Sequence, residues 1–259
     1  FWDLNYYRGA NPPPGAWRVP EFRPDYDLNA VRENWAFHCQ RLRQNPSVKL
    51  GTIAEFAAEF GRQADEASAA ELAHLARRAA ESEAPFFTDR FSAAEILDLL
   101  ARWYVARARG IDVQRLARRN VLGPAQMPLA VPTARQLDAS ALARLASGLV
   151  AAVDTTGLLP SRIRCGEGPL GTAGEIGPGA ALAALGAALS ADGFPGIVRT
   201  RIVAPYVREA EEIAACARGI INGWPCHRPD LDPSAICRLT LLQSWTLKPA
   251  WPGTVPAFA

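Results

Sequence analysis

Four residues near the end of the chain carry side chains that could bind a metal ion or form a disulfide: Cys216, Cys226, His227 and Cys237. Structural zinc sites usually combine two closely spaced ligand pairs, such as C-x-x-C. Here nine residues separate Cys216 from Cys226, and nine separate His227 from Cys237. The adjacent side chains at 226 and 227 diverge. The spacing therefore favours ordinary thiols over a disulfide of Cys226 with Cys216 or Cys237, and a disulfide over a metal site.

A cysteine hydrolase is the second chemistry that these residue types could support. It needs a thiolate activated by a histidine, with Cys165 or Cys39 as nucleophile and His227 as base. No helix directly follows Cys165, and Cys39 adjoins His38 within a predicted helix, where neighbouring side chains diverge. The sequence therefore predicts no catalytic residue.

A glycine-rich segment, residues 166–174, could be mistaken for a phosphate-binding loop. It lacks the Lys-Ser/Thr pair of a P-loop, and Glu167 and Glu175 would repel phosphate. The segment is predicted to be a connector, and no cofactor is expected.

The first 26 residues are dense in aromatic side chains and contain Pro12–Pro14. Proline and glycine at this density oppose a helix, so an extended N-terminal arm is predicted. The arm either packs on the chain's own core or stacks its rings on sugars or on a neighbouring subunit. In the second case the candidate ligand-binding residues are Trp2, Tyr6, Tyr7 and Trp17.

The overall composition is that of a globular protein. The 259 residues are 49% hydrophobic and 21% charged, with a net charge of +2. The near balance of charge gives no reason to expect nucleic acid as a partner. No apolar run is long enough to span a membrane. The chain begins with Phe1, which suggests that a leader was removed or that an upstream domain precedes it.

Periodic apolar residues predict a series of helices. The first covers residues 27–44, with Asp27 as its cap and an apolar stripe at Leu28, Val31, Trp35, His38 and Leu42. A strand at 48–50 and a short helix capped by Thr52 and Glu55 follow. Capping boxes start helices at Ser68 and Ser92. Further helices are predicted at 112–119, 133–153, 179–189 and 206–221, and a last one begins at Asp232 with a stripe at Ile236, Leu239, Leu242 and Trp245.

The helices fall into three helix–break–helix units, at residues 68–109, 138–190 and 206–248. Each contains an extended piece, and one further strand is expected at 197–203. We therefore predict a mainly α fold of serial helix–short strand–helix units with a few short β segments and the N-terminal arm. The predicted domains are residues 1–62 (the arm and two helices), 63–131 (a first helical unit) and 132–259 (the second and third units).

Two stretches resemble known families. Residues 34–42, followed by residues 48–56, resemble the end of a polysaccharide deacetylase domain, where a late helix leads into a final strand and a short T-x-x-E helix. That family's metal site needs an Asp and an H-x-x-x-H pair, and its catalytic acid is a late His. The only histidines here are His38, His74 and His227. The resemblance therefore implies that this chain is the C-terminal part of such a protein or a descendant that has lost the deacetylase activity.

The second resemblance is in the central unit. Residues 157–164, with their glycine, Leu-Pro and alternating strand, are similar to the pseudomurein-binding repeat of archaeal and bacterial wall proteins. Together with the missing start Met, the aromatic arm and the helical repeats, the two resemblances favour a non-catalytic extracellular or cell-surface module that binds cell-wall polysaccharide or self-assembles into a homo-oligomer. The alternative is a hydrolase, either part of a carbohydrate deacetylase or a Cys/His enzyme.

Overall fold

A computed structural model describes residues 24–55, 66–167, 173–191, 196–223 and 232–248. Within them the fold is mainly α-helical with short two-stranded sheets, which confirms the predicted fold class. The larger compact unit comprises Ala64–Ala217 and Ala235–Val255. The smaller one comprises Phe1–Gln63, Arg218–Ser234 and Pro256–Ala259. The domain limit predicted at residue 131 lies inside the larger unit.

Helix α2 (Asp25–Gln44) dominates the described part of the smaller unit. It begins after Pro24 without a side-chain cap, so Asp27 does not cap it as predicted but lies in its first turn. None of its residues is buried, including the predicted apolar stripe. After it, Thr52 and Glu55 make the predicted capping box, in which the Glu55 carboxylate accepts from the Thr52 N–H at 2.7 Å.

The larger unit begins with a strand–helix–helix–strand motif. Strand β1 (Glu66–Ser68) leads into α4 (Ala69–Glu81), and α5 (Ala93–Ala108) leads into β2 (Arg115–Ala117). The strands pair antiparallel, with Ala67 opposite Leu116. Ser68 and Ser92 close the predicted capping boxes at the starts of α4 and α5. After α5, Gly110 adopts a positive φ of 72°, a conformation that glycine adopts without steric cost.

A second motif of the same kind follows. Strand β3 (Gln136–Asp138) leads into α6 (Ala139–Thr156), and α7 (Pro178–Ser190) leads to β6 (Ile197–Arg199). These strands also pair antiparallel, with Leu137 opposite Val198. Between the helices lies a hairpin of β4 (Ile163–Glu167) and β5 (Ala173–Ile176). In both motifs the strand's last residue, Ser68 or Asp138, is also the N-cap of the helix.

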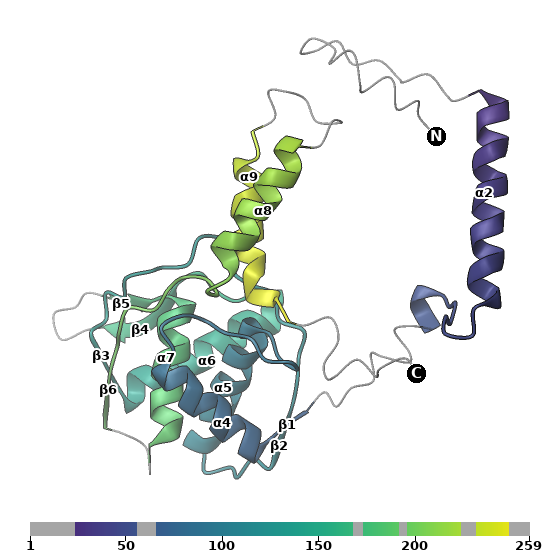
Figure 1. Cartoon of the computed structure of the whole chain (residues 1–259). Coiled ribbons are helices and arrows are strands. Elements are labelled where there is room, and N and C mark those ends of the chain that lie inside the picture. Colours follow the sequence, from purple (N-terminus) through teal and green to yellow (C-terminus); the bar gives the residue numbers. More distant parts are fainter. Residues whose placement is uncertain (1–23, 56–65, 168–172, 192–195, 224–231, 249–259) are drawn as a thin grey trace. The chain divides into compact units, whose positions relative to one another are not determined.

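The two motifs interlock to form one core. Helix α4 packs most extensively on α7, and α5 packs on α6, so each helix finds its main neighbour in the other motif (Figure 1). The shared core is rich in leucine and alanine, including Leu72, Leu100, Leu142 and Leu185, all nearly inaccessible. The Arg201 guanidinium, just beyond β6, donates to the carbonyls of Ala80 (2.8 Å) and Ser82 (2.5 Å) at the end of α4. This contact connects the segment that follows β6, in the second motif, to α4 in the first motif.

The last described elements are α8 (Ala210–Gly223), α9 (Ser234–Gln243) and the 3₁₀ turn η1 (Ser244–Thr246). As predicted, Asp232 caps α9, where its carboxylate accepts from the Ser234 N–H at 2.9 Å. Trp245 is fully buried and donates its indole N–H to the Pro205 carbonyl at 2.8 Å. In the described residues no helix is both long enough and apolar enough to cross a membrane.

Several predicted elements differ from the observed ones. Residues 48–50 form no strand. Residues 115–117 form a strand rather than part of a helix, because they pair with β1. The helix predicted from residue 133 begins only at Ala139, because β3 occupies residues 136–138. Strand β4 extends into the start of the predicted glycine-rich connector (residues 166–167), and β5 begins at its end (residues 173–174). The helix predicted from residue 206 begins at Ala210. Ile236 and Leu239 in the predicted α9 stripe are about half exposed, whereas Leu242 and Trp245 are buried.

Candidate functional site

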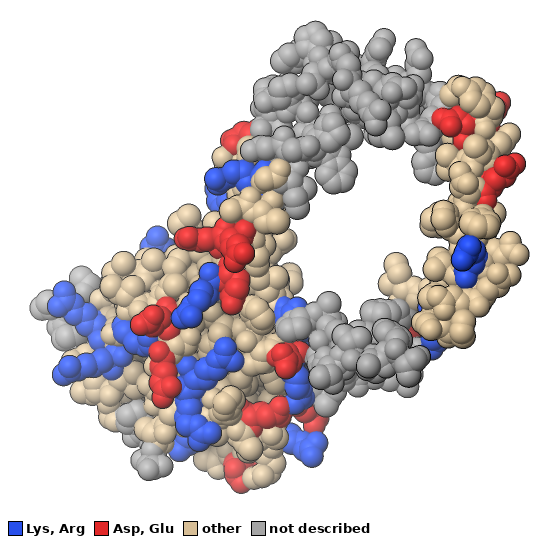
Figure 2. Space-filling view, in the orientation of Figure 1, with Lys and Arg blue, Asp and Glu red and all other residues tan. Residues whose placement is uncertain are grey.

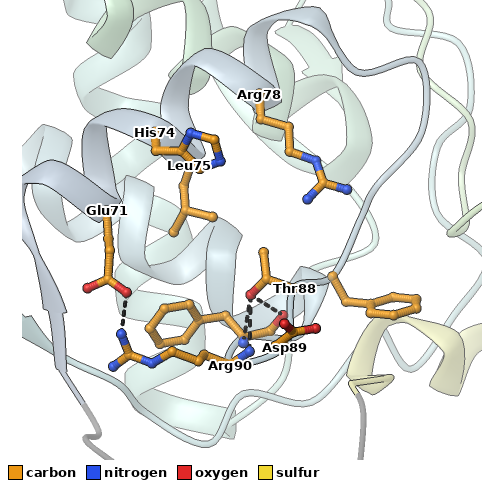
Figure 3. Close-up of a pocket in the computed structure, with 9 residues that line it drawn as sticks. Glu71, His74, Leu75, Arg78, Thr88, Asp89 and Arg90 are labelled. Atoms are coloured by element: carbon orange, nitrogen blue, oxygen red, sulfur yellow. Dashed lines mark hydrogen bonds and ion pairs between the residues drawn. The ribbon is translucent and has the colours of Figure 1, made fainter. Parts of the chain in front are cut away.

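An open cleft of about 440 Å³ lies between α4 and the segment that connects α4 to α5 (Figure 3). Polar side chains and aromatic rings line it together: Glu71, His74, Leu75 and Arg78 from α4, and residues 87–91 from the connection. His74 and Arg78 are exposed. Among the described residues, this is where a histidine, carboxylates, guanidinium groups and aromatic rings converge on one hollow.

Glu71 is fixed at one end of the cleft. Its carboxylate accepts from the Ser68 N–H at 3.0 Å and pairs with the Arg90 guanidinium, which also donates to the Glu66 carbonyl at 2.8 Å. Burial raises the pKa of Glu71, but the hydrogen bonds from Ser68 and the charge of Arg90 outweigh it, so that the pKa lies below its usual value. Glu71 is therefore an ionised anchor at neutral pH rather than a proton donor.

The floor of the cleft is a tight turn around Thr88. The Thr88 N–H donates to the Phe91 carbonyl at 2.8 Å, and the Thr88 hydroxyl accepts from the N–H groups of Phe91 (3.0 Å) and Arg90 (3.3 Å). Phe91 is buried beneath the turn. This bonding holds the exposed Asp89 and the half-buried Phe87 in place at the surface.

Arg78 forms the opposite end. Its guanidinium carbon lies 4.0 Å from the centre of the Phe86 ring, a cation–π contact. A second cleft of about 420 Å³ begins on the far side of Arg78 and Phe87 and extends to Arg208 and Glu209. The two clefts share Arg78 and Phe87 among their lining residues, so they are neighbours separated by these side chains.

The cleft combines ring faces with planar, multidentate hydrogen-bonding groups. The guanidinium, carboxylate and imidazole groups provide donors and acceptors in fixed directions, and the aromatic rings provide flat apolar surface. This combination is suited to bind a ligand that has both hydroxyl groups and apolar C–H faces. Its one hydroxyl side chain, that of Thr88, is engaged by the turn, and no cysteine lines it.

A second cluster of charged groups is buried beside α5. Glu95 (3% exposed) accepts from Arg118 at 2.8 Å and Lys248 at 2.9 Å. Asp98 (0% exposed) pairs with Arg102 and Arg119. Each buried carboxylate thus has two cationic partners, and the pairs attach α5 to the residues just after β2 and to Lys248, the last residue that the structure describes. We interpret this cluster as structural.

The cysteines occupy separate environments. Cys165 is buried in β4, and its burial raises the pKa of the thiol to about 11, which keeps it protonated near neutral pH. Cys39 is half-buried on α2, Cys216 is exposed on α8, and Cys237 is buried on α9. Cys226, His227 and the predicted ligand-binding residues Trp2, Tyr6, Tyr7 and Trp17 lie outside the described residues. The metal or disulfide prediction and the aromatic-arm prediction therefore stay predictions.

In the described segments, the cleft included, no three His, Cys, Asp or Glu side chains are arranged to hold a metal ion. The sequence predicts the capping box at Ser68, of which Glu71 is part, but it did not predict the cleft. The signal available was the Glu71–His74–Arg78 spacing, which places three polar groups on one helical face. The contribution of Arg90 depends on a tertiary contact and has no local signature.

Comparisons with models of protein families, with curated proteins and with solved structures find no match for this chain.

Proposed function

We propose that this chain is a non-catalytic module that binds a polysaccharide of the cell wall, outside the cell, through the cleft between α4 and residues 87–91. The observation that carries the proposal is that Arg78 of α4 lines one open cleft together with Phe87 and Asp89, which flank Thr88 in a turn fixed by hydrogen bonds. Sugar rings offer apolar C–H faces for an aromatic ring and hydroxyl groups for planar charged side chains. The two wall-related sequence resemblances point to the same ligand class.

The size of the cleft and the presence of a neighbouring cleft also support a chain-like ligand. Its volume of about 440 Å³ is within the range of about 300–1,000 Å³ usual for small-ligand sites. The second cleft beyond Arg78 and Phe87 would accommodate further units of the same chain. A ligand that occupied both clefts would bind more tightly as its length increased.

The alternative, a hydrolase, has less support from the same residues. General acid catalysis at neutral pH needs a carboxylic acid with a raised pKa, whereas the pKa of Glu71 is lowered. A cysteine nucleophile needs a lowered pKa, whereas burial raises the pKa of Cys165 to about 11.

The direct test is a calorimetric titration of the full chain with soluble wall fragments, for example N-acetylglucosamine oligomers and peptidoglycan fragments of two to six sugar units. We expect binding that strengthens with oligomer length. Phe87→Ala and Arg78→Ala should each weaken it about tenfold, the loss expected from about 1.4 kcal/mol. Arg77→Ala is the matched control, because Arg77 is exposed on α4 and does not line the cleft.

Two outcomes would overturn the proposal. One is the absence of binding by the folded wild-type chain to every fragment. The other is release of acetate or of reducing ends from these fragments that is lost in His74→Ala, which would instead identify a hydrolase.

A further inference from the structure

Helix α2 lies in a different unit from the cleft and carries an apolar seam without any buried residue. We propose that α2 pairs antiparallel with α2 of a second copy of this chain, so that the protein self-associates. The proposal is independent of polysaccharide binding, because none of the α2 residues lines the proposed cleft.

The spacing of the seam is that of a coiled coil. Its members recur alternately three and four residues apart, as the a and d positions of a heptad do: Leu28, Val31, Trp35, His38 and Leu42. Trp35 is 70% exposed and Leu42 is 42% exposed. An apolar stripe of this kind on a helix is usually covered by a partner.

The charges at the two ends of α2 indicate which partner and which direction. The first turn is acidic, with Asp25 and Asp27, and the last turn is basic, with Arg41 and Arg43. Figure 2 shows the same polarity, with acidic side chains toward the beginning of the helix and basic ones toward its end. A second copy in antiparallel orientation places opposite charges together at both ends, whereas a parallel copy places like charges together. The antiparallel pair also aligns the helix dipoles favourably.

One register satisfies both the seam and the charges. When Val31 packs against Trp35 of the second copy, Leu28 meets His38 and Asp27 lies beside Arg41, and the two-fold symmetry repeats each contact. The helix is about 30 Å long, so the contact area is small compared with a standard interface of about 1,600 Å². We therefore expect a dissociation constant in the micromolar range rather than an obligate dimer.

The test uses the full chain and two charge-reversal variants in analytical ultracentrifugation. D25R/D27R makes both ends of α2 basic, and R41E/R43E makes both ends acidic. We expect the wild-type chain to dimerise with rising concentration, each variant alone to dimerise at least tenfold more weakly, and an equimolar mixture of the two variants to form a mixed dimer. Recovery in the mixture also shows that both variants are folded.

Two single substitutions test the seam itself. Trp35→Ala should weaken association at least tenfold, whereas Glu33→Lys, a charge change on the opposite side of the helix, should leave it unchanged. A wild-type chain that stays monomeric up to about 100 µM overturns the proposal and means that another partner or this chain's own residues cover the seam. A dimer that both charge-reversal variants preserve, or a mixture that does not recover, overturns the antiparallel pairing.

Discussion

Asp98 is fully buried on α5, and its carboxylate is held by the Arg119 guanidinium, whose Nε donates to Oδ2 at 3.1 Å while Nη2 pairs with Oδ1. A buried carboxylate is tolerated only when it is paired and hydrogen-bonded. The hydrogen bonds to Asp98 raise the pKa of Arg119 above its usual value. The contact fixes the position of the chain just after β2 on the face of α5.

Replacement of Arg119 by alanine should destabilise the protein strongly. Asp98 would keep Arg102 as a partner but lose its bidentate contact with Arg119. Breaking a buried ion pair costs about 3 kcal/mol or more. Urea denaturation followed by circular dichroism measures the change. Asp154→Ala is the control, because it removes the exposed partner of Arg119 and leaves the contact with Asp98 in place. A loss below about 1 kcal/mol in Arg119→Ala would show that the contact contributes little.

Glu71 should make the stability depend on pH in the acid range. Its pKa in the folded protein lies below the ordinary value of 4.5, so its contribution is present above about pH 4.5 and is lost as the pH falls through the folded-state pKa. We expect the urea midpoint of Glu71→Gln to fall less than that of the wild-type chain between pH 6 and pH 3. Glu81→Gln, at an exposed position on the same helix, should behave like the wild type. Equal acid sensitivity in all three proteins would contradict the assigned role of the Ser68 and Arg90 contacts.

Local signals in the sequence account for much of the helical framework. The Ser68–Glu71 and Ser92–Glu95 boxes predict the starts of α4 and α5 because each joins residues three apart, within one helical turn. The three-residue strands β1 and β2 had no such signal, since a short strand is defined by a partner that is distant in sequence.

The candidate site and the buried charges were harder to predict. Asp98 lies on a helix whose burial extends nearly all round, so the sequence indicates neither the burial of its carboxylate nor its partner Arg119. Likewise the Glu71–Arg90 contact joins a helix to a turn beyond it. Such pairs join residues that are distant in sequence, so a single sequence predicts them only when the contact between their two segments is already known.

Alkylation should distinguish the cysteines by burial. Cys216 is exposed and should react with iodoacetamide at pH 7.5 in the folded protein, whereas Cys165 and Cys237 are buried and should be protected. For Cys165 the raised pKa of about 11 adds to the protection, because the thiolate is the reactive form. Mass spectrometry of peptides labelled with and without urea measures both effects. If Cys165 were labelled in the folded chain as fast as Cys216, β4 would not be buried and the Cys165 thiol would be accessible as a nucleophile.

The contact between α4 and α7 depends on the absence of a side chain at Gly186. A Cβ at this position would lie 2.6 Å from the Ala80 nitrogen and 2.7 Å from the Ala76 carbonyl oxygen, both backbone atoms that cannot turn aside. Gly186→Ala should therefore separate the helices and destabilise the fold by about 1–3 kcal/mol, although alanine is the better helix former.

Gly148→Ala on α6 provides the matched control, because a Cβ there meets no atom within 4 Å. In that open position the higher helix propensity of alanine should stabilise the protein by about 0.5–1 kcal/mol. Thermal unfolding of the two variants should therefore shift in opposite directions from the wild type. If Gly186→Ala were instead as stable as Gly148→Ala, α4 and α7 could not approach as closely as they do here, and the interlocking of the two motifs would be wrong.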